Sequence, residues 1–265
     1  LHTVAFFTGL LAVIWATCSR ISMYAMVSFE SHMIAHMMLS MLAPILLVLG
    51  APVTLALRAL PAVSDGHERS PRAWLAGLLH SRYSQFITQP LVVLAIFTFG
   101  LYGIYFTSTF SSLMSGHIGH MFMEVHFLLT GFLFAFTVIG IDPAPRPLPH
   151  WARLLMVLVA MSLHAFFAVA IMQATQPLGD AWYSQVRPPW IVTPLADTYA
   201  GGGVAWAIGE VPSMVLLVVV AVQWAISDDR LAARTDRESD RTNDAQLREY
   251  NERLRLLNER NSGNN

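Results

Sequence analysis

The sequence predicts an all-α integral membrane protein, a polytopic bundle of about six transmembrane helices with a charged C-terminal tail. Two observations support this prediction. Of the 265 residues, 55% are hydrophobic and only 12% are charged, about half the charged fraction of ordinary soluble domains. The charges are also unevenly placed, since 17 of the 33 lie from Asp228 onward. We therefore expect a lipid-embedded domain over residues 1–227 and a charged, partly helical cytoplasmic tail over 228–265.

Six apolar runs are long enough to cross a hydrocarbon core of about 30 Å. Pro44, Gly50 and Pro52 interrupt the second run, which predicts either a kinked helix or a full span followed by a short interfacial piece. The connection 58–89 carries prolines and charges and is typical of an ordinary solvated loop. The glycines at 201–203 open the sixth run and indicate close helix packing. The runs cover residues 2–19, 33–57, 90–107, 119–141, 152–173 and 204–226.

The basic residues predict the orientation of the chain. All sixteen are arginines, and fourteen of them lie in the connections 58–89 and 142–153 and in the tail. The positive-inside rule therefore places these segments and both termini in the cytoplasm, in a multi-pass protein of the plasma membrane. No charged region precedes the first run, so we expect no signal peptide and either a non-standard start or the C-terminal part of a longer protein. A net charge near zero argues against a nucleic-acid partner.

Histidines collect in the half of the bundle that this orientation places outside. His32 and His36 begin the second run, four residues apart, so that both rings can face one metal ion. Two satisfied interfacial histidines would show the same spacing. His164 lies within the fifth run, and Asp197 closes the last outer connection. Because ionisable residues inside spans are costly, they indicate function by default.

The start of the fourth run holds a second group of candidate ligands. His117, His120 and Glu124 share one helix face, whereas His126 lies about 120° from His120. One straight helix cannot aim all of these groups at one point. The helix therefore begins after His120, or a distortion realigns it, or His126 serves a different neighbour.

Methionines add a softer hint about the metal. Met33 and Met37 belong to a group that surrounds the outer ends of the second and fourth runs. Thioether sulfur together with imidazole suits Cu(I), although methionine is also a routine packing residue in apolar helices. The predicted metal ligands are His32, His36, His120, His126 and His164, with Glu124, Asp197, Met33 and Met37 as supporting candidates.

Glu210 is a further acid within a span, in the sixth run. A hydrogen bond to a neighbouring helix is the structural interpretation of this residue. Proton or ion handling is the functional one.

These motifs resemble those of CtaG-like cytochrome c oxidase assembly factors, over the second to the sixth run. The order and spacing of six segments carry the resemblance. One departure is Thr198 after Asp197, where the family usually has Gln. The segments are S-F-E-S-H-M-I-A-H-M at 28–37, L-A-P-I-L-L-V-L-G-A-P-V-T at 42–54, G-H-M-F-M-E-V-H-F-L-L-T-G at 119–131, I-D-P-A-P-R at 141–146, L-H-A-F-F at 163–167 and P-L-A-D-T-Y-A-G-G-G-V-A-W at 194–206.

The resemblance implies a non-enzymatic role in maturing the copper-containing catalytic subunit of a respiratory oxidase. Relatives that carry this domain behind a copper-resistance-type membrane domain would explain a chain that begins inside a span. The expected cargo is Cu(I), and the expected partners are the oxidase catalytic subunit and the lipid bilayer. Alternatives are a haem-binding or haem-transferring protein, a non-catalytic scaffold for an oxidase subunit, and a small-ion transporter that depends on Glu210. The sequence leaves the oligomeric state open.

Overall fold

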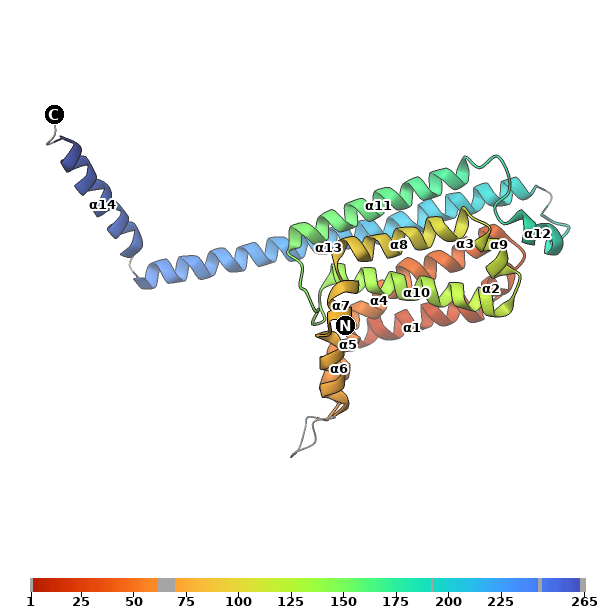
Figure 1. The fold of residues 1–265 in the computed structure, drawn as a ribbon, viewed down its shortest axis with the longest axis horizontal. Coiled ribbons are helices and arrows are strands. Elements are labelled where there is room, and N and C mark those ends of the chain that lie inside the picture. The colour runs from red at the N-terminus through yellow and green to blue at the C-terminus, as the bar shows by residue number, and fades with distance from the viewer. Residues whose placement is uncertain (1, 62–69, 192, 243–244, 263–265) are drawn as a thin grey trace. The chain divides into compact units, whose positions relative to one another are not determined.

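The computed structural model describes residues 2–61, 70–191, 193–242 and 245–262, and its residues divide into two compact units, Leu1–Val220 and Ala221–Asn265. The described residues are helical and contain no strand. In the first unit the long helices run side by side as one bundle (Figure 1). They are α1 (His2–Cys18), α3 (Phe29–Met37) continued by η1 (Met38–Leu42) and α4 (Ala43–Leu49), α8 (Pro90–Tyr105), α10 (His117–Ile139), α11 (His150–Met172) and the start of α13 (Pro194–Thr242).

The bundle confirms the prediction of a helical membrane domain. Within the described chain, four helical segments are long and apolar enough to cross a membrane: Phe29–Leu49, His117–Ile139, His150–Met172 and Pro194–Ser239. The first and third predicted runs form α1 and α8, apolar helices of 17 and 16 residues. Each lies in the same bundle as the longer spans (Figure 1).

The second predicted run contains both kinds of irregularity that its prolines indicate. A π-helical turn, η1, joins α3 to α4, and Pro44, the second residue of α4, follows it directly. The span ends at Gly50, and Ala51 adopts a left-handed conformation at φ 52°. The short helix α5 (Pro52–Ala59) follows as the separate piece.

Asp142 fixes the start of α5 from a distant part of the chain. Its carboxylate accepts hydrogen bonds from the backbone N–H of Val53 and Thr54 at 3.3 and 2.8 Å, and from the Thr54 hydroxyl at 2.6 Å. A carboxylate is the preferred partner for the free N–H groups of a helix N-terminus. The connection after α10 is thereby tied to the end of the second span.

The connection 58–89, predicted to be an ordinary solvated one, contains two short helices among the residues that the structure describes there. They are α6 (Pro71–Leu79) and α7 (Arg82–Ile87). Ser70 and Ser81 cap them, since each serine oxygen accepts a hydrogen bond from the backbone N–H three residues later. The segment 62–69 lies outside the described residues.

Short helices tie together the opposite end of the bundle, the end predicted to lie outside. They are α2 (Arg20–Ala25), α9 (Thr109–Met114) and α12 (Asp180–Val186). From α12, the Trp182 indole N–H donates to the Met26 carbonyl at 2.9 Å, and the Tyr183 hydroxyl donates to the Ala25 carbonyl at 3.1 Å. These bonds hold α12 against the end of α2.

Glycines allow two of the close helix approaches that the sequence indicates. A Cβ at Gly201 would lie 2.5 Å from the Phe29 ring, and one at Gly202 would lie 2.7 Å from the Met172 side chain. A Cβ at Gly203 would meet nothing within 4 Å. Close packing is therefore confirmed at the first two glycines and is wrong for the third.

The second unit holds the rest of α13 and the helix α14 (Ala245–Ser262). It includes the segment that the sequence assigns to the tail, for which the boundary at residue 228 stays a prediction.

Candidate functional site

The histidine pair of α3 forms one buried unit with a tyrosine of α8. His32 and His36 lie one helical turn apart, with 4% and 2% of their surfaces exposed. The Tyr105 hydroxyl stands between them, 2.7 Å from His32 Nε2 and 3.1 Å from His36 Nδ1. The two imidazoles therefore do face one point, as their spacing predicts, and a phenol oxygen occupies that point.

The single proton of that hydroxyl makes the two imidazoles unequal. Tyr105 donates its O–H to one ring and accepts an N–H from the other. A neutral imidazole carries one N–H, so the ring that donates to Tyr105 has a lone pair on its remaining nitrogen, whereas the other ring has an N–H there. Those remaining atoms, His32 Nδ1 and His36 Nε2, are buried and have no hydrogen-bond partner.

The helix α10 brings His120 to the same cluster. The ring centroids of His120 and His32 are 5.9 Å apart, and His120 Nδ1 lies 3.6 Å from Glu124 Oε1. His117, one turn earlier, is exposed to the surroundings of the bundle. Glu124 therefore contacts a candidate ligand of its own helix.

His126 faces a different helix from His120. The helix α10 runs without interruption from His117 to Ile139, so the start after His120 and the distortion are both wrong. A Cβ at Gly100 would lie 2.5 Å from His126 Nε2, which shows that this ring packs against the backbone of α8. His126 Nε2 is buried there without a hydrogen-bond partner.

His164 of α11 is the most isolated imidazole of the group. It is 2% exposed, and neither ring nitrogen has a hydrogen-bond partner. A Cβ at Gly209 of α13 would collide with the His164 ring, so the ring occupies space that only a glycine leaves open. His164, His126 and His32 are ionisable side chains near enough to His36 to interact with it electrostatically.

The cluster as it stands is not a closed metal site. In the part of the chain that the structure describes, no group of three or more His, Cys, Asp and Glu side chains is spaced to hold a metal ion. Aromatic rings separate the imidazoles instead, and the centroid of the Phe127 ring lies 3.7 Å from that of His36. What the arrangement does offer is several buried nitrogens that lack hydrogen-bond partners at the meeting point of α3, α8, α10 and α11.

Asp197, a supporting candidate for a metal ligand, has a structural role. Its carboxylate accepts hydrogen bonds from the Ser28 hydroxyl and from the backbone N–H groups of Phe29 and Glu30, at 2.9, 2.8 and 3.2 Å. It thus caps the N-terminus of α3 and holds the helix that carries His32 and His36.

The remaining supporting candidates and Glu210 have the following positions. Met33 and Met37 are fully buried in the hydrophobic core. Glu210 Oε1 is buried with no hydrogen-bond partner, so that oxygen does not make the expected bond to a neighbouring helix.

Sequence reasoning missed Tyr105, Gly100 and Gly209. Tyr105 is the last residue of α8 and one of two tyrosines in that helix, and its side chain is 2% exposed. The sequence did contain a signal for this residue, namely a tyrosine at the same predicted membrane depth as the histidines. Neither glycine stands out in the sequence, because its role depends on which ring a neighbouring helix presents.

Comparison with known proteins identifies the family of this chain. Residues 1–227 match the sequence profile of a family described as cytochrome c oxidase caa3 assembly factor, CtaG. The chain belongs to this family. The match includes the first span, which the motifs quoted above did not cover.

Relatives of this CtaG-family chain occur in mycobacteria. The chain is 43% identical over 255 residues to an uncharacterized protein of Mycobacterium leprae (strain TN) and 42% identical to uncharacterized proteins of Mycobacterium bovis and Mycobacterium tuberculosis. Each alignment covers 96% of this chain and 39% of the relative. The chain therefore spans about two fifths of the length of these relatives. No solved structure matches it.

Two aspartates of the family-like motifs now have physical roles. Asp142 from I-D-P-A-P-R caps α5, and Asp197 from P-L-A-D-T-Y caps α3. Thr198, which stands where Gln is usual, accepts a hydrogen bond from the Leu178 N–H at 3.2 Å. In this CtaG-family chain, both motifs connect parts of the bundle that are distant in sequence.

Proposed function

We propose that this CtaG-family chain delivers Cu(I) to the catalytic subunit of a respiratory cytochrome c oxidase from the outer half of the membrane. The family supplies the link to oxidase assembly. One observation carries the copper step, namely the buried imidazole nitrogens without partners on α3, α10 and α11. Leaving such a group unpaired costs about 1–3 kcal/mol. A bound ion would remove that cost.

The donor set suits Cu(I) better than a harder ion. Neutral imidazole is a good ligand for copper, and methionine sulfur in the same core favours the Cu(I) state. Two of the candidate carboxylates are engaged or peripheral, because Asp197 caps α3 and Glu124 lies beside His120. Carboxylate-rich sites are those that select harder ions.

His36, His126 and His164 are the residues that would hold the ion, with His32 and His120 beside them. Copper is the cargo in this proposal. The protein supplies buried imidazole nitrogens that bind the ion and later release it. The orientation predicted from the arginines places this cluster toward the outer face, at a depth suited to lateral transfer within the membrane. The transfer itself requires no catalysis by this chain.

Haem binding is less well supported. The cluster is filled by aromatic side chains, with the Tyr105 ring stacked at 6.0 Å on Phe127 and tilted at 4.9 Å against Phe110. A macrocycle would have to displace these rings. An optical spectrum of the purified protein distinguishes the two ligands, because haem held by two histidines has sharp visible bands and Cu(I) has none.

The scaffold alternative is tested in cells. A strain that lacks the protein should assemble oxidase apoprotein deficient in its copper centre, and added copper should partly restore activity. The measurement is copper content and activity of the purified oxidase under copper limitation. Expression of the His36→Ala variant in that strain should leave the defect in place. Full rescue by His36→Ala would instead support a scaffold, and full activity without the protein would refute the assembly role.

A further inference from the structure

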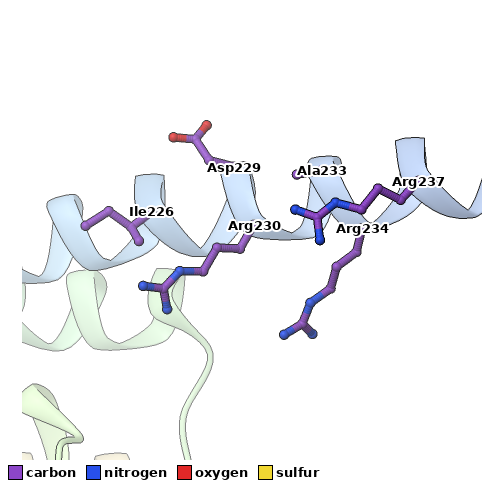
Figure 2. A pocket seen from close by; sticks show the side chains of 6 residues that line it. All are labelled: Ile226, Asp229, Arg230, Ala233, Arg234 and Arg237. Carbon is purple, nitrogen blue, oxygen red and sulfur yellow. The ribbon is translucent and has the colours of Figure 1, made fainter.

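The second unit carries an arginine face that the copper proposal does not use. Arg230, Arg234 and Arg237 of α13 lie four and three residues apart, which places them within about 60° of one another around the helix. With Ile226, Asp229 and Ala233, they line a shallow hollow of about 290 Å³ (Figure 2). The lining residues all belong to this one helix.

The ion pairs His120–Glu124 and Arg255–Glu259 of the described residues do not involve these three arginines. Asp229 points away from Arg230 and Arg234, to the other side of the helix (Figure 2). The face therefore gathers three positive charges on one side of the helix.

The arginine side chains extend toward the N-terminal end of their segment, where Ile226 lies (Figure 2). That end, residues 221–227, is apolar and contains Trp224, a residue type enriched where a span meets water. Long cationic side chains that reach back along a helix toward its apolar end are typical of the membrane interface. In membrane proteins, guanidinium groups of such side chains lie at the level of the lipid headgroups.

We propose that this face, Arg230–Arg234–Arg237, binds the phosphate group of anionic phospholipids at the surface where α13 leaves the membrane. Guanidinium groups bind phosphate with paired, charge-assisted hydrogen bonds. Clusters of arginine next to a span attract anionic lipid. The proposal does not depend on copper, because it uses residues of the second unit only.

The test uses the full chain purified in a neutral detergent and titrated with short-chain phosphatidylglycerol or phosphatidylcholine, with bound lipid counted by native mass spectrometry. The test variant is Arg230→Gln/Arg234→Gln/Arg237→Gln. The matched control removes three charges from the other helix of the unit, as Arg248→Gln/Arg253→Gln/Arg255→Gln. Soluble glycerol phosphate, added as a separate competitor, distinguishes a lipid headgroup from a free phosphate compound.

We expect wild type and the control variant to prefer phosphatidylglycerol over phosphatidylcholine, and the test variant to lose at least about tenfold in phosphatidylglycerol affinity. The preference should weaken with salt, since it is electrostatic. Equal loss in both variants, or no preference in wild type, would overturn the proposal. Displacement by millimolar glycerol phosphate would also overturn it, in favour of a soluble ligand. Unchanged lipid binding together with lost co-purification of oxidase would replace it with a protein contact.

Discussion

Tyr105 controls the geometry of the His32–His36 pair, since its hydroxyl contacts both rings. Tyr105→Phe would keep the ring packing and remove the oxygen between the imidazoles. Their tautomers and orientations would then no longer be fixed, and loss of such an outer partner lowers metal affinity by about 10–100-fold. We predict a loss of that size in Cu(I) affinity, measured by competition with a Cu(I) chelator.

Tyr183→Phe is the matched control for that change. Tyr183 is also buried, and its hydroxyl donates to the Ala25 carbonyl, away from the histidines. Loss of this hydroxyl should lower the thermal stability of the protein and leave its Cu(I) affinity unchanged. If both variants lost Cu(I) affinity equally, the effect would be one of stability and Tyr105 would have no specific role.

The spacing of His32 and His36 predicts their shared direction, because helical phase is local. It could not predict what stands at the point they face, because Tyr105 belongs to a helix about 70 residues later. For Asp197, too, the sequence could not predict which distant residues the side chain contacts. Its place in a histidine-rich end of the bundle suggested a ligand, whereas its oxygens cap a helix 168 residues away.

The π-helical turn η1 is a place where the second span and α10 come into close contact. It presents the Ser40 carbonyl to Gly131 of α10, and a Cβ at Gly131 would collide with that oxygen. Gly131→Ala should therefore force the two helices apart and destabilise the protein by about 1–3 kcal/mol. Thermal unfolding of the purified variant in detergent measures the effect.

Gly103→Ala is the corresponding control in α8. A Cβ at Gly103 would meet nothing within 4 Å, and alanine favours a helix over glycine. This variant should be as stable as wild type or slightly more stable. Equal stability of the Gly131 and Gly103 variants would show that the contact at η1 is not tight.

At the scale of whole helices, the sequence predicts more of the structure than it does for the contacts of single residues. Apolar runs of 18–25 residues predict the spans, because lipid requires a continuous hydrophobic surface. The prolines predict the break after α4 as well, since proline cannot continue the hydrogen-bond ladder. The helices α6 and α7 were not predicted, because prolines and charges in this connection are typical of a loop and hide the caps at Ser70 and Ser81.

For the whole molecule, orientation decides whether the histidine cluster faces the outer leaflet. The arginine distribution predicts that Ser70 and the tail are cytoplasmic and that Ser112 is external. Reporter fusions at these three positions in living cells measure this. An external tail would reverse the orientation and place the histidines toward the cytoplasm.

The most direct test of the central claim is a double-mutant cycle for Cu(I) affinity that combines His36→Ala with His126→Ala. The claim is that imidazoles of α3 and α10 serve one ion. His36→Ala alone should reduce affinity by about tenfold or more, whereas His117→Ala, at an exposed position of α10, should change nothing. Because the two groups share an ion, the double variant should lose less than the sum of the single losses. Full additivity of the two changes would mean that α3 and α10 do not share a metal, and would contradict the account.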